Sequence, residues 1–384
     1  MINFVKPVAF VSNILSKYRI PCFGRLGEKL HRSITFYFLT EKMSHRSMLL
    51  AQKHSEIQAQ WLRGWKWRSP PKDDRHFNDI LPILKGNADI LVLSAWDEPT
   101  YVLLWLWGVL LRKKIIFWIE STAADGRRQG LKETYKKLLL SQASGCIVPG
   151  MRSFDYCRIL GMPESRIFVA PNAVDRKFFR SQSDHLLPGR EEIRRELGLS
   201  GVVILFVGRM VEEYKNISYL IRSFQRLKTS GKEVSLSMVG DGPDRANYEE
   251  MVKRQNIFGV QFLGEMGHEQ LCRVYAAADI MVLPSRSETW GFVLNEAMEF
   301  GLPLVVTDRV GAGPDLVYPG ENGFIVPSGD EAALVKALEK LIKDPGLRTK
   351  MGQASRKIVE HFSPENWAAG VVSAIVAVSR DTRC

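Results

Sequence analysis

One stretch of the chain, residues 280–306, indicates the fold most clearly. It reads Ile-Met-Val-Leu-Pro-Ser-Arg-Ser-Glu-Thr-Trp-Gly-Phe-Val-Leu-Asn-Glu-Ala-Met-Glu-Phe-Gly-Leu-Pro-Leu-Val-Val. It starts as an apolar strand, passes through a glycine turn into a helical segment, and ends in a second apolar strand after Gly-Leu-Pro. Short apolar strands joined by a helix are βα units of a parallel sheet. The stretch therefore predicts an α/β fold.

The same alternation runs along the whole chain and predicts two Rossmann-like, doubly wound domains. A polar, non-periodic segment at 181–189 that ends in Pro-Gly separates residues 1–180 from residues 190–360. A helix over 363–380, after a Ser-Pro-Glu start, is expected to pack back on the first domain. The expected strands are 8–11, 34–39, 90–93, 115–118, 145–148 and 167–170, then 202–207, 235–239, 260–263, 280–283, 304–306 and 324–326.

Composition narrows the class of protein. The chain has 384 residues, 45% of them hydrophobic and 25% charged, which fits two globular domains. Its five cysteines show no metal-ligand spacing, so reduced thiols and a cytoplasmic protein are expected. No secretory signal is evident at the start. The longest apolar run, 101–111, is too short to span a bilayer, and a buried helix is favoured over an interfacial one.

Charge is unevenly distributed along the chain. Residues 1–180 hold 29 Lys and Arg against 15 Asp and Glu, whereas the remainder holds 24 against 27. A strongly basic first half is consistent with nucleic acid, an anionic membrane surface at the inner membrane face, an anionic acceptor, or simply a solvated surface.

Two carboxylates in the opening stretch suggest a ligand site. Glu288 precedes the glycine turn and Glu296 interrupts the apolar face of the helix that follows. A buried carboxylate needs partners, and the N–H groups of a helix start suit a phosphate. Two acids on either side of a phosphate match the order sugar, diphosphate, ribose of a sugar nucleotide. Two solvated acids on an ordinary helix are the alternative.

The ends of the other strands of the second domain carry glycines and cations. In an open α/β sheet ligands bind outside the carboxyl ends of the strands. Arg209 and Lys215 follow the strand 202–207 and are placed to neutralise a diphosphate, unless they merely pair with Glu212 and Glu213. Gly240-Asp241-Gly242-Pro243 follows the strand 235–239 and is either a ligand loop or a plain turn.

These features together resemble the retaining GT-B glycosyltransferases of family 4, the glycosyl transferases group 1. The resemblance is dense over about 167–345 and is carried by several motifs. They are Pro171-Asn172-Ala173-Val174-Asp175, Gly208-Arg209 with Lys215-Asn216, Val239-Gly240-Asp241-Gly242-Pro243, the Glu288 to Glu296 spacing, and the loops 311–317 and 322–324.

The resemblance implies a role for each matching residue. Arg209 and Lys215 would hold the diphosphate, Glu288 would bind donor-sugar hydroxyls, and Glu296 would bind the ribose. Configuration at the anomeric carbon would be retained and no metal or other cofactor would be needed. Trp290, in place of the family's more usual phenylalanine-containing segment, would form a wall of the sugar pocket. The remaining donor-binding residues would be Gly208, Gly240, Gly242, Gly264, Glu265, Met266, Gly291, Phe292 and Val293.

The first domain resembles the family less closely. Tyr18, Arg19 and Gly24 are candidates for an acceptor-side loop after the first strand, similar to one bacterial subgroup. Glu120 follows another strand end and is a candidate catalytic group, with a helix cap or an ion pair to Arg127 or Arg128 as the alternative. The aromatic and basic run 61–68 is consistent with an acceptor contact, a membrane contact or a surface strand.

The sequence thus predicts a glycosyltransferase that moves a sugar from a UDP- or GDP-linked donor to a glycan or lipid-linked acceptor. Bacterial cell-surface polysaccharide or glycolipid synthesis is the expected setting, with peripheral membrane contact as a hypothesis from charge. Alternatives on the same fold are a sugar-nucleotide epimerase, a glycogen-synthase-like enzyme and an inactive family member. A basic nucleic-acid-binding protein is the alternative of another class, and the sequence lacks any recognisable nucleic-acid module.

Overall fold

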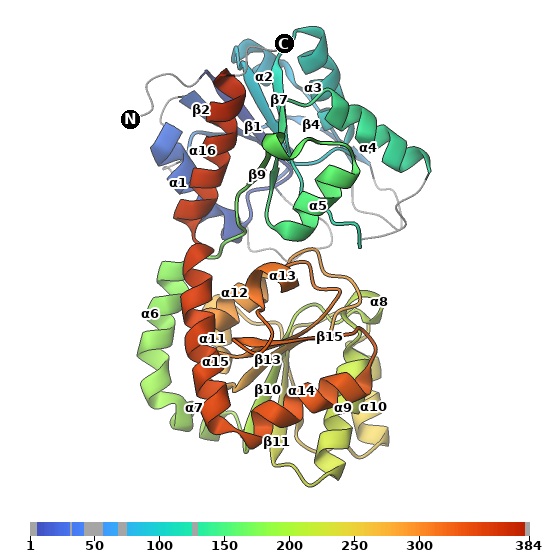
Figure 1. Cartoon of the computed structure of the whole chain (residues 1–384), viewed down its shortest axis with the longest axis vertical. Coiled ribbons are helices and arrows are strands. Elements are labelled where there is room, and N and C mark those ends of the chain that lie inside the picture. The colour runs from blue at the N-terminus through green and yellow to red at the C-terminus, as the bar shows by residue number, and fades with distance from the viewer. Residues whose placement is uncertain (1–5, 31–32, 42–56, 68–74, 125–129, 381–384) are drawn as a thin grey trace. The chain divides into compact units, whose positions relative to one another are not determined.

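The structure is a computed structural model, and it describes residues 6–30, 33–41, 57–67, 75–124 and 130–380. The chain forms two compact units (Figure 1). Unit 1 comprises Met1–Val174 and Ser363–Cys384, and unit 2 comprises Asp175–Phe362. Each unit is built on its own parallel sheet covered by helices, as expected for Rossmann-like domains.

Unit 1 contains a seven-stranded parallel sheet in the order β3-β2-β1-β6-β7-β8-β9. Its central strands are continuous apolar runs because helices cover both faces of the sheet. A separate antiparallel pair, β4 and β5, lies outside this sheet. The strands are β1 (Val8–Ser12), β2 (Ile34–Phe38), β3 (Ala59–Trp61), β4 (Gly64–Trp67), β5 (Arg75–Asn78), β6 (Ile90–Leu93), β7 (Lys114–Trp118), β8 (Gly145–Val148) and β9 (Ile167–Val169).

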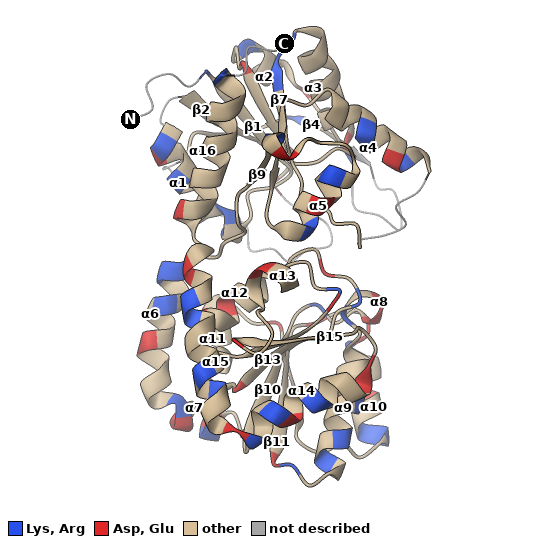
Figure 2. Cartoon of the chain, viewed as in Figure 1, with Lys and Arg blue, Asp and Glu red and all other residues tan. Residues whose placement is uncertain are grey.

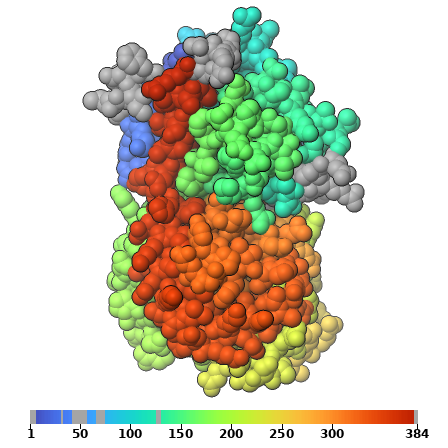
Figure 3. Space-filling view, in the orientation of Figure 1, coloured from blue at the N-terminus to red at the C-terminus, as the bar shows by residue number. Residues whose placement is uncertain are grey.

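Two helix layers cover the sheet of unit 1. Helices α1 and α16 share one core cluster with one face of the sheet, and α2 to α5 share a second cluster with the other face. Figure 3 shows α1 in blue beside α16 in red, so helices from the first and the last part of the chain lie side by side. The helices are α1 (Ile20–Leu30), α2 (Leu81–Lys85), α3 (Pro99–Leu110), α4 (Leu131–Ser141), α5 (Met151–Ile159) and α16 (Pro364–Arg380).

Unit 2 contains a six-stranded parallel sheet in the order β12-β11-β10-β13-β14-β15. The strand order reverses direction between β10 and β13, which makes their carboxyl ends the switch point where open α/β sheets bind ligands. The strands are β10 (Val202–Val207), β11 (Val234–Val239), β12 (Val260–Gly264), β13 (Ile280–Leu283), β14 (Leu304–Thr307) and β15 (Gly323–Val326).

Aspartate caps fix several helix starts in unit 2. The side chain of Asp175 accepts a hydrogen bond from the N–H of Phe178, and Asp330 and Asp344 cap α14 and α15 in the same way. The helices are α6 (Arg176–Leu186), α7 (Arg190–Glu196), α8 (Glu212–Lys215), α9 (Ile217–Thr229), α10 (Arg245–Arg254), α11 (His268–Ala277), α12 (Phe292–Glu299), α13 (Gly313–Leu316), α14 (Glu331–Lys343) and α15 (Pro345–Ile358).

The structure differs from the sequence-based expectation at two places. The units divide between Val174 and Asp175 rather than at 181–189, because Asp175 caps α6 and Phe179 packs against His268 of α11 within unit 2. In that helix Ser181, Asp184 and His185 are exposed, whereas Ser183 is buried. The sheet of unit 1 also has an edge strand, β3, at the start of the aromatic and basic run 61–68.

Candidate functional site

The carboxyl ends of three neighbouring strands in unit 2 are linked through glycines. The N–H of Gly208 donates to the carbonyl of Val239 at 3.0 Å, and the N–H of Gly240 donates to the carbonyl of Gly264 at 2.8 Å. These bonds join the ends of β10, β11 and β12 at the edge where a ligand would bind. The predicted donor-site residues Gly208, Gly240 and Gly264 therefore lie together.

Gly240 is required by close packing as well as by backbone conformation. Its φ is +128°, and a Cβ atom built there would lie 2.1 Å from the carbonyl oxygen of Gly208. No larger residue fits because the obstructing atom belongs to the backbone. The contact keeps the loop after β10, which carries Arg209, directly against the loop after β11.

The next residues continue this contact between loops. The N–H of Met210 donates to the carbonyl of Asp241 at 2.8 Å, and the N–H of Asp244 donates to the carbonyl of Met210 at 3.2 Å. Gly242 lies so near that a Cβ on it would be 2.3 Å from the carbonyl oxygen of Met210. The segment 240–243 is thus part of the site framework and not an isolated surface turn.

Lys215 and Glu288 form an ion pair at the switch point. Lys215 ends α8 after β10, and Glu288 follows β13, so strand order brings together two residues that are far apart in sequence. Both side chains are mostly buried, at 18% and 17% exposure. Lys215 also lies next to Gly208, with its Nζ 3.8 Å from where a Cβ of that glycine would be.

Arg209 is exposed and makes no side-chain ion pair with any residue in the described part of the chain. Arg209 does not form the alternative ion pair with Glu212. The carboxylate of Glu212 instead accepts hydrogen bonds from Ser218 and Tyr248 and pairs with Arg286 at 3.5 Å. Burial and the Glu212 carboxylate raise the pKa of Tyr248. Arg209 therefore presents a guanidinium to solvent at the strand ends.

The loop 310–312 fixes the backbone around Glu288. The N–H of Gly311 donates to the carbonyl of Glu288 at 2.7 Å, and the N–H of Ala312 donates to the carbonyl of Trp290 at 3.1 Å. A β-bridge pairs Glu288 with Val310. The acid is thus held from two directions, by these backbone bonds and by Lys215.

Glu296 is fully buried on α12, about one helical turn beyond the glycine turn. It accepts a hydrogen bond of 2.7 Å from the hydroxyl of Tyr275 on α11, a partner that the sequence alone did not suggest. Burial, together with the charges of Glu296 and Glu269, raises the pKa of Cys272 to about 12. A carboxylate in this setting is held in a fixed orientation.

Trp290, predicted as a wall of a sugar pocket, has its side chain packed into the protein next to the glycine turn. Its side chain is buried at 4% exposure, its indole N–H donates to Asn295 at 3.0 Å, and its ring packs 6.1 Å from that of Phe362. The indole therefore belongs to the core beneath the turn. Burial of this large aromatic ring against apolar helix residues stabilises the fold around the turn.

The other predicted donor residues lie along the same edge. Gly291 is the N-cap of α12, and Phe292 and Val293 are half-buried in its first turn, where helix N–H groups lack intrahelical partners. Glu265 is exposed and Met266 half-buried directly after β12. Both residues come directly after Gly264, the last residue of β12, whose carbonyl accepts the hydrogen bond from Gly240.

In unit 1 the structure brings together two residues predicted for separate roles. Arg19 pairs with Glu120, and the same guanidinium donates to Asn172 Oδ1 at 2.8 Å. The guanidinium also lies 4.3 Å from the ring centre of Trp118. Arg19 is buried whereas the Glu120 side chain is 39% exposed, so Arg19 holds an acid that faces outward. The suggested partners Arg127 and Arg128 lie outside the described residues.

Gly24 does not lie in a loop. It falls within α1, with nothing within 4 Å of a Cβ built on it, and Tyr18 is half-buried in the short 3-10 helix just before. The expectation of a glycine loop after the first strand is therefore wrong. The Pro-Cys-Phe-Gly segment instead follows a helical period, with Cys22, Phe23, Leu26 and Leu30 on the buried face.

Further charged clusters in unit 2 were not expected from the sequence. Glu299, fully buried on α12, pairs with Arg176 at 2.6 Å and Arg180 at 2.7 Å, which attaches α6 to α12. No local pattern signals this pairing, because the partners lie more than a hundred residues apart.

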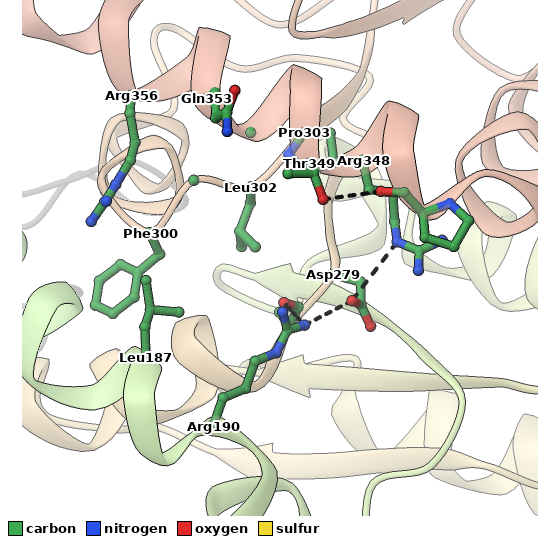
Figure 4. A pocket seen from close by; sticks show the side chains of 14 residues that line it. Leu187, Arg190, Asp279, Phe300, Leu302, Pro303, Arg348, Thr349, Gln353 and Arg356 are labelled. Atoms are coloured by element: carbon green, nitrogen blue, oxygen red, sulfur yellow. Dashed lines mark hydrogen bonds and ion pairs between the residues drawn. The ribbon is translucent and has the colours of Figure 1, made fainter.

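A pocket of about 330 Å³ lies at the amino ends of β13 and β14, the edge opposite the strand ends discussed above. Figure 4 shows Asp279 between Arg190 and Arg348 there, with Arg190 at 2.7 Å and Arg348 at 3.9 Å. Arg190 and Arg348 also donate to backbone carbonyls at helix or strand ends. The cluster anchors α7 and α15 beneath the sheet, and it contains none of the predicted site residues.

Two other kinds of feature are absent from the described residues. No group of three or more His, Cys, Asp or Glu side chains in that part of the chain is arranged to hold a metal ion. Within the same residues, no helix combines the length and apolar character needed to cross a membrane.

Known proteins resemble this chain in sequence and in fold. Residues 189–358 match the family described as Glycosyl transferases group 1. The alpha-D-kanosaminyltransferase of Streptomyces kanamyceticus is 32% identical over 166 residues, 43% of this chain and 42% of the relative. The D-inositol 3-phosphate glycosyltransferase of Corynebacterium diphtheriae is 34% identical over 217 residues, 54% of this chain and 48% of the relative. The aligned segment thus spans about half the length or less of these relatives.

The fold comparison covers nearly the whole chain. The crystal structure of Anabaena HepE in complex with UDP superposes with a TM-score of 0.75 at 16% identity, over 97% of this chain and all of the other. At this identity the likeness speaks for the fold. Residues 189–358 are thus similar to the glycosyl transferases group 1 family, and the chain has the GT-B fold of two Rossmann-like units.

Proposed function

We propose that the protein is a glycosyltransferase that moves a sugar from a nucleoside diphosphate sugar to an acceptor. One observation carries the proposal. At the switch point of the second sheet, the Lys215–Glu288 ion pair lies beside the exposed Arg209 and close to the start of α12 in sequence. This arrangement offers two cations, a helix N-terminus and a carboxylate within one strand edge, as a sugar diphosphate requires.

Donor binding would exchange partners within this arrangement. The diphosphate would take Lys215 from Glu288 and would also meet Arg209, so that two positive charges balance the two negative charges of the diphosphate. Glu288, held by the backbone bonds from Gly311 and Ala312, would then be available for hydroxyl groups of the donor sugar. Glu296, oriented by Tyr275, would accept hydrogen bonds from the ribose.

In the transfer step the bond from the anomeric carbon to the diphosphate oxygen breaks and a bond to the acceptor oxygen forms. We propose retention of configuration, with a leaving phosphate oxygen receiving the acceptor proton on the same face. The protein would contribute position and charge stabilisation for the departing diphosphate through Arg209 and Lys215. This scheme needs no metal ion or other cofactor.

The acceptor would be a glycan or a lipid-linked glycan in bacterial cell-surface polysaccharide or glycolipid synthesis, on the cytoplasmic side. The basic composition of residues 1–180 supports an anionic acceptor. Arg19 and Glu120 are the candidate acceptor-side groups in unit 1, with Glu120 oriented by the buried guanidinium.

A nucleotide screen tests the proposal without knowledge of the acceptor. UDP, GDP, ADP and CDP are compared by thermal shift, since a ligand that binds only the folded protein raises its melting temperature. One nucleotide should stabilise the wild type, and the shift should be lost in Arg209→Ala. The corresponding UDP- or GDP-sugars are then incubated with acceptor glycans, and release of the diphosphate and the anomeric configuration of the product are measured. If no nucleoside diphosphate shifts the melting temperature, the proposal is overturned.

A further inference from the structure

Exposed apolar side chains are unevenly distributed between the two units. Of the large apolar residues that are exposed in the described part of the chain, most belong to unit 1, and unit 2 contributes only Tyr214, Phe258 and Tyr318. Eight of the twelve in unit 1 lie on or directly after α3, on α4 or on the β4–β5 pair, and the other four are Leu81, Met151, Ile159 and Val169. Helix α3 is also free of charged residues, and Figure 2 shows it in tan.

Helix α3 is buried on one side only, although the sequence favoured a buried helix. Tyr101 and Leu104 lie in the core, and Gly108 packs so closely that a Cβ on it would be 3.0 Å from Ile115. Leu106 and Leu110, one helical turn apart, are 52% and 79% exposed. Val109 and Leu111 are exposed as well, which leaves the second half of the helix with an uncovered apolar side.

The β4–β5 pair presents a second apolar surface. Its inner side is held firmly, since the N–H of His76 donates to Glu98 at 2.8 Å and the N–H of Asn78 donates to Thr100 at 2.9 Å, both partners at the start of α3. On the outer side Trp65 and Phe77 are directly paired across the strands. Trp65 is 84% exposed. A rigid ribbon thus carries two aromatic rings away from the core.

Cations border these apolar residues. Arg112 is exposed immediately after α3, and it is followed by Lys113 and Lys114. On α4, which covers the same face of the sheet as α3, the exposed Leu131 is followed by the exposed Lys132, and the exposed Lys137 precedes the exposed Leu138. We name the exposed residues at the end of α3, Leu106, Val109, Leu110, Leu111 and Arg112, the apolar–basic face; Leu131, Lys132, Lys137 and Leu138 of α4 are exposed over the same face of the sheet.

We propose that the apolar–basic face docks on an anionic lipid bilayer, with the second half of α3 in the interfacial layer. Exposed leucines beside lysine and arginine complement acyl chains and lipid phosphates together, whereas nucleic acid would use the cations and leave the leucines in water. The twelve residues of α3 extend about 18 Å, too short to span a hydrocarbon core of about 30 Å. The helix therefore lies along the bilayer surface. This docking does not depend on the donor chemistry proposed above.

Vesicle flotation of the full-length protein without nucleotide tests the docking. The vesicles contain phosphatidylcholine and phosphatidylglycerol in equal amounts, and vesicles of phosphatidylcholine alone serve as the uncharged comparison. The wild type should float with the anionic vesicles at low salt. Leu106→Ser with Leu110→Ser should weaken partitioning by about tenfold or more, because two leucine side chains no longer leave water. Arg112→Ser should weaken it less and should reduce its dependence on salt.

Phe258→Ser is the matched control, since Phe258 is 77% exposed but lies in unit 2. It should bind vesicles like the wild type. All replaced side chains are exposed, so melting temperatures should stay unchanged and folding defects would be recognised. The proposal is overturned if the wild type does not bind anionic vesicles, if the leucine pair is without effect, or if Phe258→Ser weakens binding equally. Binding that salt abolishes and the leucine variant does not alter would likewise contradict an apolar docking face.

Discussion

Replacing Gly240 with alanine should damage the donor site, although the substitution adds only one methyl group. The new Cβ would lie 2.1 Å from the carbonyl oxygen of Gly208, whereas real Cβ atoms essentially never approach within 3.0 Å. The loops after β10 and β11 must therefore separate by about 0.9 Å. The residue must also keep a φ of +128°, which costs a non-glycine residue about 1–3 kcal/mol.

We expect a total loss of about 3 kcal/mol or more in the free energy of unfolding of unit 2, since overpacking against backbone adds about 1–3 kcal/mol to the conformational cost. Because Gly208 precedes Arg209, the shift also misplaces that guanidinium. A displacement near 1 Å in a positioned group can lower a rate about 10²-fold. Urea unfolding measures the first effect, and release of nucleoside diphosphate from the identified donor measures the second.

Gly231→Ala is the matched control. Gly231 has a φ of +73° but no atom within 4 Å of its Cβ position, so it tests the conformational cost without the collision. It should lose about 1 kcal/mol of stability and keep full activity. Equal stability losses in the two variants, together with normal activity of Gly240→Ala, would show that the contact with Gly208 does not shape the site.

Further predictions concern individual side chains. Glu288→Gln should lower kcat by about 10²-fold or more in the transfer assay, and an unchanged kcat would remove this acid from the reaction. Arg209→Ala should leave the melting temperature unchanged, because the side chain is exposed, while nucleotide affinity falls; unchanged affinity would contradict its phosphate role. Tyr275→Phe removes the hydrogen bond to buried Glu296 and should cost about 1–3 kcal/mol in urea unfolding. Cys272, whose pKa burial raises to about 12, stays a neutral thiol at pH 8, so mass spectrometry should find it unalkylated in the folded protein and alkylated in urea.

Much of the second unit could be predicted from sequence because its signals are local. The apolar run Val202–Val207 is β10 to the residue, since a strand buried on both faces must be apolar throughout. The edge strand β3, Ala59–Trp61, escaped prediction because it is short and half-exposed. The glycines at the strand ends were also predictable, because few residue types fit backbone atoms in contact.

Local sequence patterns were enough to predict two parallel α/β units, a resemblance to one enzyme family, and the residue types at the strand ends of the second sheet. Tertiary structure alone decided which of these residues meet. It paired Lys215 with Glu288 and Arg19 with Glu120, buried Trp290 beneath the turn, and left one side of α3 uncovered. The periodicity of apolar residues and the conformational preference of the backbone depend only on residues close in sequence. Side-chain contacts and burial depend instead on the order of the strands and on which neighbouring helices and strands pack over each side chain.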